Sequence, residues 1–309
     1  PLFITTLASD ISTNDLRGLL VSLFNMADVL REASHLAAAK RFFDYALRLA
    51  VVTNSGLSEA RFNAMVGAVS RGDWVEASDQ YENNMEVQRQ RPDNADLWCR
   101  CQMATALDEL GTINYLERAL RMNKDNIRYL TEIHYTWAIY ALEKKQIETA
   151  QSHAEAAVNF ARKTNDRIQG AALSTLAYAY VSAGRIKAAH DLIGQAARAS
   201  CSPRFLPDRE IGRAWVYYHL GNRDKAVSLA KKAYKLAWAD GESSNPNHQP
   251  GYTWWLPLQR AKKLLKTLEV ALPGLPEFDT LNITKLPVED RIDHFITNLE
   301  PQDKSWWMP

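Results

Sequence analysis

Apolar residues recur along this chain at the spacing of amphipathic helices, and the helices that they predict come in pairs. In five places an alanine is followed at +4 and +7 by further packing residues. The leading alanines are Ala39, Ala77, Ala150, Ala189 and Ala226. They lie 38, 73, 39 and 37 residues apart, and 73 is close to twice 37. We therefore expect a degenerate copy between the second and the third, and the period predicts a helical repeat fold.

The pattern places six antiparallel helix hairpins in residues 14–240, after a lead-in over residues 1–13 that shows no clear helical spacing. Gly72, Gly184 and Gly221 mark turns, because glycine adopts the left-handed conformation that ends a helix. The third hairpin is the degenerate one, with its turn at Leu110-Gly111. The last four hairpins are expected over residues 96–123, 126–163, 167–199 and 207–240. In such an array each hairpin packs only on its neighbours.

Residues 241–309 have a different composition and are expected to form a capping helix and a proline-rich tail. A loop over residues 241–251 precedes an amphipathic helix over residues 254–271 and a short helix over residues 288–299. This segment holds Trp254, Trp255, Trp306 and Trp307. Tryptophan pairs need burial, so we expect the first pair to cap the last hairpin. The second pair either joins this cap or docks on another domain or subunit.

The fifth and sixth hairpins share their large, small and aromatic positions with a known repeat family. In the fifth these positions are Leu173, Leu176, Ala177, Tyr180, Gly184, Ala189, Ile193 and Ala196, followed by Pro203. In the sixth they are Ala214, Tyr217, Gly221, Ala226, Ala230 and Ala233. The spacing resembles tetratricopeptide (TPR) repeats, with a period longer than that family's usual length of about 34 residues. The resemblance implies an all-α fold, a right-handed α-solenoid in which helix pairs form a superhelix with a concave groove.

The segment after residue 251 resembles, more loosely, the closing segment of repeat arrays in STAND-type signalling NTPases. That resemblance implies a regulatory sensor region of a larger protein.

The family resemblance also places the first helix of each hairpin on the groove, and with it eight candidate partner-binding residues. They are Phe24, Asp28, Phe62, Tyr135, Tyr178, Trp215, Tyr218 and His219. Aromatic side chains in a groove are good anchors for a peptide. The alternative is that they pack between hairpins. Acidic residues predominate among the charged groove candidates, which favours a basic ligand; these candidates are Asp28, Arg31, Glu59, Asp108, Glu132, Glu143 and Asp208.

Charge and composition narrow the function classes. The chain has 37 basic and 36 acidic residues, so no overall field attracts nucleic acid or an anionic membrane. No apolar run reaches the roughly 18 residues that span a bilayer. The cysteines Cys99, Cys101 and Cys201 are too few for a disulfide framework, which indicates a reducing compartment and a cytoplasmic location. The start at Pro1 suggests a piece of a longer protein.

No motif in the sequence calls for a cofactor or a metal. The glycine motifs that cradle phosphates do not occur, and the histidines are scattered one per helix. Cys99 and Cys101 are two apart, so on a helix they do not face each other. We therefore expect no cofactor and no metal site.

We interpret the chain as a non-catalytic module, acting as sensor or scaffold, that binds a protein or peptide in its groove. No pair of residues has catalytic spacing, and any NTPase or effector domain would lie outside this chain. The alternative is a structural adaptor that joins subunits through its convex face and tail. The partner is left open between a separate protein or peptide, a second copy of the chain and another domain of its own protein.

Overall fold

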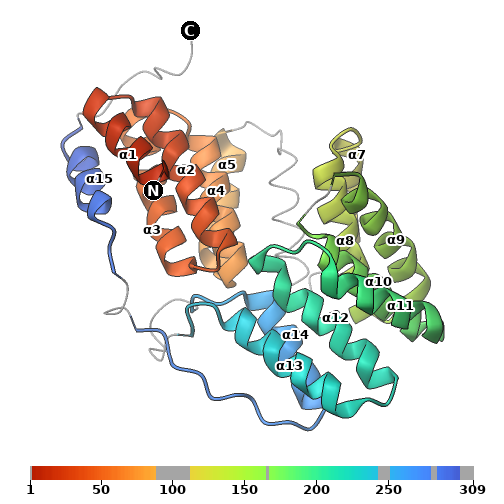
Figure 1. Cartoon of the computed structure of the whole chain (residues 1–309). Coiled ribbons are helices and arrows are strands. Elements are labelled where there is room, and N and C mark those ends of the chain that lie inside the picture. The colour runs from red at the N-terminus through yellow and green to blue at the C-terminus, as the bar shows by residue number, and fades with distance from the viewer. Residues whose placement is uncertain (1, 88–111, 165–166, 243–250, 280–283, 300–309) are drawn as a thin grey trace. The chain divides into compact units, whose positions relative to one another are not determined.

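The computed structural model describes residues 2–87, 112–164, 167–242, 251–279 and 284–299 (Figure 1). Within these ranges the regular secondary structure is helical, and the single exception is an isolated bridge between Gly241 and Tyr252. The chain divides into two compact units. Unit 1 comprises residues 1–92, 240–252 and 277–309, and unit 2 comprises residues 93–239 and 253–276. Each unit therefore takes residues from both halves of the chain.

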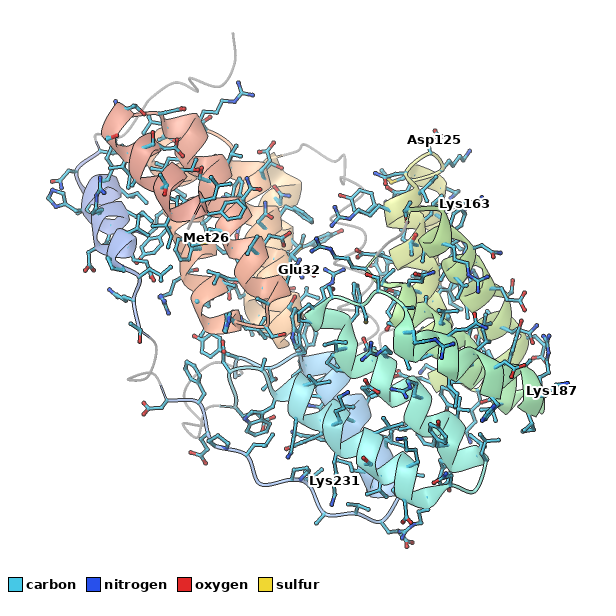
Figure 2. All side chains as sticks on the ribbon, viewed as in Figure 1. Met26, Glu32, Asp125, Lys163, Lys187 and Lys231 are labelled. Atoms are coloured by element: carbon cyan, nitrogen blue, oxygen red, sulfur yellow. The ribbon has the colours of Figure 1, made fainter. Side chains whose placement is uncertain are left out.

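Unit 1 contains two complete hairpins and one further helix at each end of the chain. Its helices are α1 (Leu2–Thr13), α2 (Leu16–Glu32), α3 (Leu36–Thr53), α4 (Leu57–Arg71), α5 (Trp74–Val87) and α15 (Pro287–Thr297). The first hairpin, α2 and α3, packs on the second, α4 and α5, through α3 and α4. Met26 of α2 lies in this unit (Figure 2) and is buried.

Residues 2–13 form a helix, although the lead-in showed no clear helical spacing. Phe3, Ile4, Leu7 and Ile11 fall on one side of α1, and Leu7 is completely buried in the core cluster of unit 1. On α2, Ser22 donates a hydrogen bond to Asp10 of α1 at 2.7 Å. The intervals of three to four residues between Ile4, Leu7 and Ile11 are those of a helix face.

The turns of unit 1 follow from local chemistry. The Asp15 carboxylate caps α2 by accepting a hydrogen bond from the Gly18 amide at 2.9 Å. Gly72 ends α4 with φ of 74°, and Asp73 then accepts from the Glu76 amide at 3.2 Å, which starts α5. The turn at Gly72 was predicted from the residue type alone.

Helix α15 returns from the C-terminal segment to pack on α1 and α3 (Figure 1). Its buried residues Val288, Ile292 and Ile296 join the core of the first hairpin. Glu289, also buried, accepts two hydrogen bonds from Arg41 of α3, at 2.7 and 2.9 Å. The expectation that each hairpin packs only on its sequence neighbours is wrong for this helix, because a docked segment from the other end of the chain covers the first hairpin.

Unit 2 contains the later hairpins. Its helices are α7 (Thr112–Met122), α8 (Ile127–Glu143), α9 (Ile147–Thr164), α10 (Gln169–Ser182), α11 (Ile186–Arg198), α12 (Leu206–His219), α13 (Arg223–Trp238) and α14 (Trp255–Thr267). The pairs α8–α9, α10–α11 and α12–α13 occupy the positions of the fourth, fifth and sixth hairpins. Gly184 and Gly221 take positive φ at two of their turns. Of the degenerate third hairpin only α7 is described, and the turn at Leu110-Gly111 lies outside the described residues.

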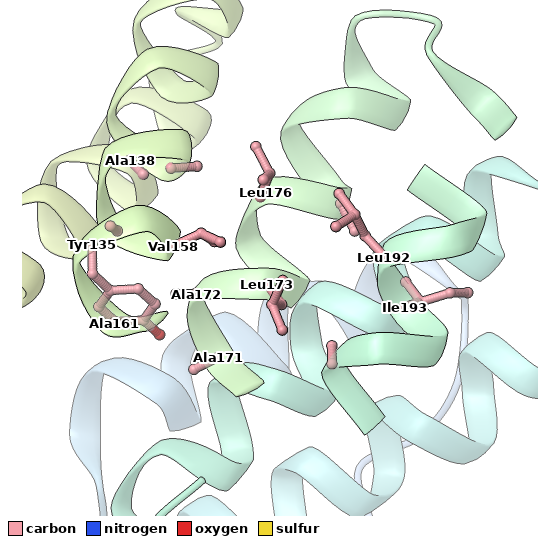
Figure 3. Packing of buried hydrophobic residues seen from close by; sticks show 14 of the residues in the cluster. Tyr135, Ala138, Val158, Ala161, Ala171, Ala172, Leu173, Leu176, Leu192 and Ile193 are labelled. Carbon is pink, nitrogen blue, oxygen red and sulfur yellow. The ribbon is translucent and has the colours of Figure 1, made fainter. Parts of the chain in front are cut away.

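Small residues let the helices of unit 2 approach closely. Its largest core cluster joins alanines of α9, α10 and α11 to a few large side chains, among them Leu173 and Ile193 (Figure 3). The leading alanines Ala150, Ala189 and Ala226 are completely buried. Charged side chains such as Lys163 and Lys187 project outward from this unit (Figure 2). The repeat pattern in the sequence is therefore the pattern of close helix contacts.

Helix α14 packs on α13 and α12 and closes the end of the last hairpin. At its start Trp254 is buried and donates its backbone N–H to the Ala237 carbonyl at 2.8 Å. Trp255 is half-buried. Trp254 and Trp255 thus lie at the start of a helix that packs on the last hairpin, whereas Trp306 and Trp307 lie outside the described residues.

Two histidines that are far apart in sequence meet between α8 and α9. The Nδ1 atoms of His134 and His153 are 2.8 Å apart, and His153 stacks on Trp137 with ring centroids 4.1 Å apart. Burial lowers the pKa of both, that of His153 to about 4. Both rings are accordingly neutral at pH 7 and act as packing residues.

Candidate functional site

Unit 2 contains a cavity of about 320 Å³ that opens between the first helices of its hairpins and the capping helix. Helices α8, α10 and α12 form three sides and α14 forms the fourth. The lining residues are Ile139, Leu142, Glu143, Lys145, Thr175, Tyr178, Asp208, Ile211, Gly212, Trp215, His219, Arg260 and Lys263. Because all of these belong to unit 2, the cavity is defined within one compact body.

An aromatic cluster forms one wall of this cavity. Tyr178 of α10 and Trp215 of α12 are stacked, with ring centroids 5.3 Å apart and planes 6° from parallel. His219 lies one turn further along α12, with its ring 6.3 Å from Trp215. Tyr218 meets Trp215 edge-on at 5.7 Å and is 39% exposed. Burial raises the pKa of Tyr178 to about 12, so its hydroxyl stays protonated and can donate a hydrogen bond at any ordinary pH.

Gly212 allows α12 to lie close enough to α10 for this stack to form. A Cβ atom at position 212 would stand 2.8 Å from both the carbonyl oxygen and the Oγ of Ser174. The carbonyl belongs to the backbone of α10 and cannot turn away as a side chain can. The close contact therefore requires glycine, and it sets the register of Trp215 over Tyr178.

Replacing Gly212 with alanine is expected to lower the free energy of unfolding by about 1–3 kcal/mol, because α12 must move away from α10. Gly194 of α11 is the matched control, since the nearest atom to its added Cβ would be Arg198 Nη1 at 3.9 Å. There the same change should stabilise by about 0.5–1 kcal/mol, the usual gain of alanine over glycine in a helix. Urea denaturation followed by circular dichroism measures both. Equal changes in the free energy of unfolding for Gly212→Ala and Gly194→Ala would contradict the close approach of α12 to α10.

A largely buried ion pair belongs to the lining of the cavity. Nη1 of Arg260 is 3.2 Å from the Asp208 carboxylate, and its Nε is 4.0 Å from Glu143. Burial raises the pKa of Asp208, with Arg260 acting in the opposite direction. Burial alone would lower the pKa of Arg260, but Asp208 and Glu143 outweigh it and raise that pKa. The pair holds the guanidinium in the wall of the cavity.

The other two cations that line the cavity are exposed. Lys145 follows the end of α8 with φ of 59°, and Lys263 lies on α14. Within the described part of the chain neither has an ion-pair or hydrogen-bond partner for its ammonium group. The lining groups therefore carry one more positive than negative charge, with Glu143 and Asp208 set against Lys145, Arg260 and Lys263.

The eight predicted groove residues do not come together at one place. Tyr178, Trp215 and His219 line the cavity, and Tyr218 contacts them. Tyr135 instead lies in the core cluster with Ala161 and Ala171 (Figure 3), and its ring meets Phe205 edge-on at 5.8 Å. For Tyr135 the packing alternative is therefore the observed one.

The remaining three candidates belong to unit 1. Phe24 packs against the core of the first hairpin, and Phe62 is half-buried on α4. Asp28 pairs with Arg31 at 2.6 Å. They contribute nothing to the cavity of unit 2.

The cavity also contains residues that sequence reasoning missed. The most important are Arg260 and Lys263, because the pattern of α14 indicates only a buried apolar face and a solvated basic one. Ile139 and Ile211 complete the apolar lining. The helical spacing of Ile211 and Trp215, one turn apart on α12, is a signal that could have placed them on one face.

Stacked antiparallel hairpins of this kind, with a site on the first helices, define the class of all-α solenoid repeat folds. No family model matches the chain, and no curated protein matches its sequence. Solved structures of TPR proteins do match. A TPR protein from Parabacteroides merdae ATCC 43184 is 14% identical, with a TM-score of 0.51 over 86% of this chain and 97% of its own.

A second structure, of YrrB, described as a TPR protein with an unusual peptide-binding site, is 18% identical with a TM-score of 0.34. It covers 83% of this chain and 97% of its own. At these identities the first match shows the fold, an all-α arrangement of TPR-like helix hairpins, and the fold does not fix the ligand.

The described residues contain no cluster of three or more histidine, cysteine, aspartate or glutamate side chains that could hold a metal ion. Cys201 is half-buried, and burial raises its pKa to about 12. Cys99 and Cys101 lie outside the described residues. Among the described helices none is both long and apolar enough to span a bilayer.

Proposed function

We propose that this chain is a non-catalytic repeat module that binds a segment of a protein or peptide partner in the cavity of unit 2. The observation that carries the proposal is the stacked pair Tyr178 and Trp215 on the wall of an open, largely apolar cavity. Aromatic side chains in a partly enclosed pocket are the groups that most often dominate the binding energy of protein interfaces.

The size and chemistry of the cavity support a peptide side chain as its occupant. Its volume of about 320 Å³ lies at the lower end of the range for ligand sites. Apolar groups from Ile139, Leu142 and Ile211 line the cavity together with the aromatic pair and a few charged groups. A site with this composition can desolvate one large apolar side chain and fix its orientation through polar contacts.

The wider role is that of a cytoplasmic sensor or scaffold in a larger signalling protein of the STAND type. This part of the proposal rests on the resemblance of the tail alone. The competing role is a structural adaptor that joins subunits through the convex face and tail, with an unoccupied cavity. The two roles differ in whether partner binding depends on Trp215.

The proposal is tested by selecting a random nonapeptide display library on the whole chain and measuring the affinity of an enriched peptide. Trp215→Ala should weaken that affinity by about 30-fold, the effect of a hot-spot residue worth about 2 kcal/mol. His219 is less buried than Trp215, so His219→Ala should weaken the peptide affinity only severalfold.

The matched control is Tyr180→Ala, two residues from Tyr178 on α10. Tyr180 instead contacts Arg185 and donates a hydrogen bond to Glu155 at 2.9 Å. This variant should bind like the wild type, and circular dichroism checks that all variants are folded. A library that yields no enriched peptide, or affinities that do not change in Trp215→Ala and His219→Ala, would contradict the proposal.

A further inference from the structure

The cavity of unit 2 is lined by two chemically distinct sets of side chains. The apolar set is the stacked pair Tyr178 and Trp215 with three aliphatic neighbours. The charged set comprises Glu143, Lys145, Asp208, Arg260 and Lys263. A ligand that fills the whole cavity must therefore carry an apolar group and a charged group close together, and the sign of that charge follows from which lining charges are already neutralised.

Both acidic groups that line the cavity lie near Arg260. Asp208 is buried and bound to Arg260 at 3.2 Å. Glu143 is exposed and lies 4.0 Å from the same guanidinium. A basic ligand would approach Glu143 against the positive charge of Arg260, and to reach Asp208 it would have to break a buried ion pair, which is costly.

The two lysines of the charged set are not neutralised in the same way. Lys145 and Lys263 come from different elements, the turn after α8 and helix α14, and both ammonium groups are exposed at the cavity. Asp208 holds Nη1 of Arg260 and so positions the rest of that guanidinium in the wall. An incoming carboxylate meets up to three cations here, two of which have no partner within the described residues.

The basic ligand that the sequence favoured is therefore not the one that this charge distribution fits. Asp28 and Glu59 belong to unit 1, and Asp28 is paired with Arg31. Glu132 is paired with Arg204 at 2.8 Å, and Asp108 lies outside the described residues. The excess of acidic residues among the groove candidates is therefore not found in the cavity. A count of charges along the helices could not reveal this, because it does not show which side chains share a site or are already paired.

We infer that the cavity recognises a peptide segment in which a carboxylate lies beside a large apolar side chain. The apolar side chain packs against Trp215 and Tyr178, and the carboxylate binds between Lys145, Lys263 and Arg260. This inference rests on the proposed function, since it names the ligand chemistry of the same site. Asp208 acts as a positioning residue that orients Arg260.

The test uses the same nonapeptide library with the whole chain, and reads the composition of the enriched peptides. Aspartate or glutamate next to leucine, phenylalanine or tryptophan should be enriched over the unselected library. The affinity of an enriched peptide should weaken about three- to tenfold in Lys263→Glu, and it should also weaken as salt is raised.

Lys231→Glu is the control, because it changes the net charge equally but lies on α13, on an exposed site outside the cavity (Figure 2). It should leave the affinity unchanged. Synthetic peptides with a free or an amidated C-terminus then identify the source of the carboxylate. Equal binding of the two forms assigns it to a side chain, and loss on amidation assigns it to the chain end.

The outcomes separate this inference from the function on which it rests. Enriched peptides that are apolar or basic, with affinities that depend on Trp215 but not on Lys263, would overturn the carboxylate preference and leave peptide binding standing. A library without any enriched peptide would overturn both. Equal losses in Lys263→Glu and Lys231→Glu would also overturn the inference, because they would reflect overall charge rather than this site.

Discussion

Replacing Glu210 with glutamine is expected to lower the free energy of unfolding by about 3–5 kcal/mol, the cost of removing one partner from a buried ionic cluster. Glu210 is completely buried on α12 and is bound by Arg209 at 2.8 Å, Arg213 at 2.7 Å and Lys232 at 3.1 Å. Glutamine has nearly the same size, so the change removes the charge and leaves three cations without their shared carboxylate. Arg209 and Arg213 would lose the most stabilisation, because both are largely buried and their Nε atoms have no hydrogen bond.

Urea denaturation of the two forms at pH 7 measures this difference. Lys232→Met serves as the control, since the lysine side chain is 55% exposed and Glu210 would keep both arginines. We expect that variant to change stability by no more than about 1 kcal/mol. If the glutamine variant were as stable as the wild type, the buried charge of Glu210 would not contribute to the stability of unit 2.

The pH dependence of the same cluster provides a second measurement. Burial alone would raise the pKa of Glu210, but Arg209, Arg213 and Lys232 outweigh it and the pKa is lowered from 4.5. A carboxyl group whose pKa is lower in the folded protein than in the unfolded chain stabilises the fold when the pH is above its unfolded pKa. This stabilisation is lost as the pH falls through the lowered pKa of the folded protein. The wild type should therefore lose stability below about pH 4.5 more steeply than Glu210→Gln.

The sequence predicted the parts of this fold that depend on neighbouring residues. The turns at Gly72, Gly184 and Gly221 are fixed by residue type within a few positions, and the leading alanines follow from the contact between two helices of one hairpin. The docking of α15 could not be predicted in this way. Arg41 and Glu289 are 248 residues apart, and nothing local marks either as the partner of the other.

The candidate site was predictable to the same extent. Tyr178 and Trp215 were found because both lie on the first helices of well-patterned hairpins. Arg260 and Lys263 were missed because α14 follows the repeats, and its basic residues look like a solvated helix face. Tyr135 lies on the same stripe of α8 as Ile139 and Leu142, one and two turns before them, but it belongs to the core cluster and does not line the cavity. Helical spacing identifies the face on which a residue lies. It does not show how far along that face the cavity extends.

Replacing Glu289 with glutamine is expected to lower the free energy of undocking α15 from the rest of unit 1 by about 2–3 kcal/mol. The reason is that Glu289 is the buried partner of Arg41. Glutamine keeps an acceptor for the Leu286 amide, which now donates to Glu289 at 2.8 Å and caps the helix. The change therefore removes the charge of the ion pair without removing the cap. Hydrogen exchange of the α15 amides measures undocking directly, and we expect it to become about 30- to 150-fold faster.

The same helix contains its own control for this prediction. Asp293 pairs with Arg48 at 2.5 Å, but both side chains are about half exposed. Water can replace such a pair at little cost, so Asp293→Asn should leave the exchange of α15 unchanged. If exchange becomes faster in Glu289→Gln but not in Asp293→Asn, the ion pair of Glu289 with Arg41 stabilises the docking of α15 because it is buried. Equal acceleration in both variants would contradict this and would assign the docking of α15 to its surface charge rather than to the buried contact.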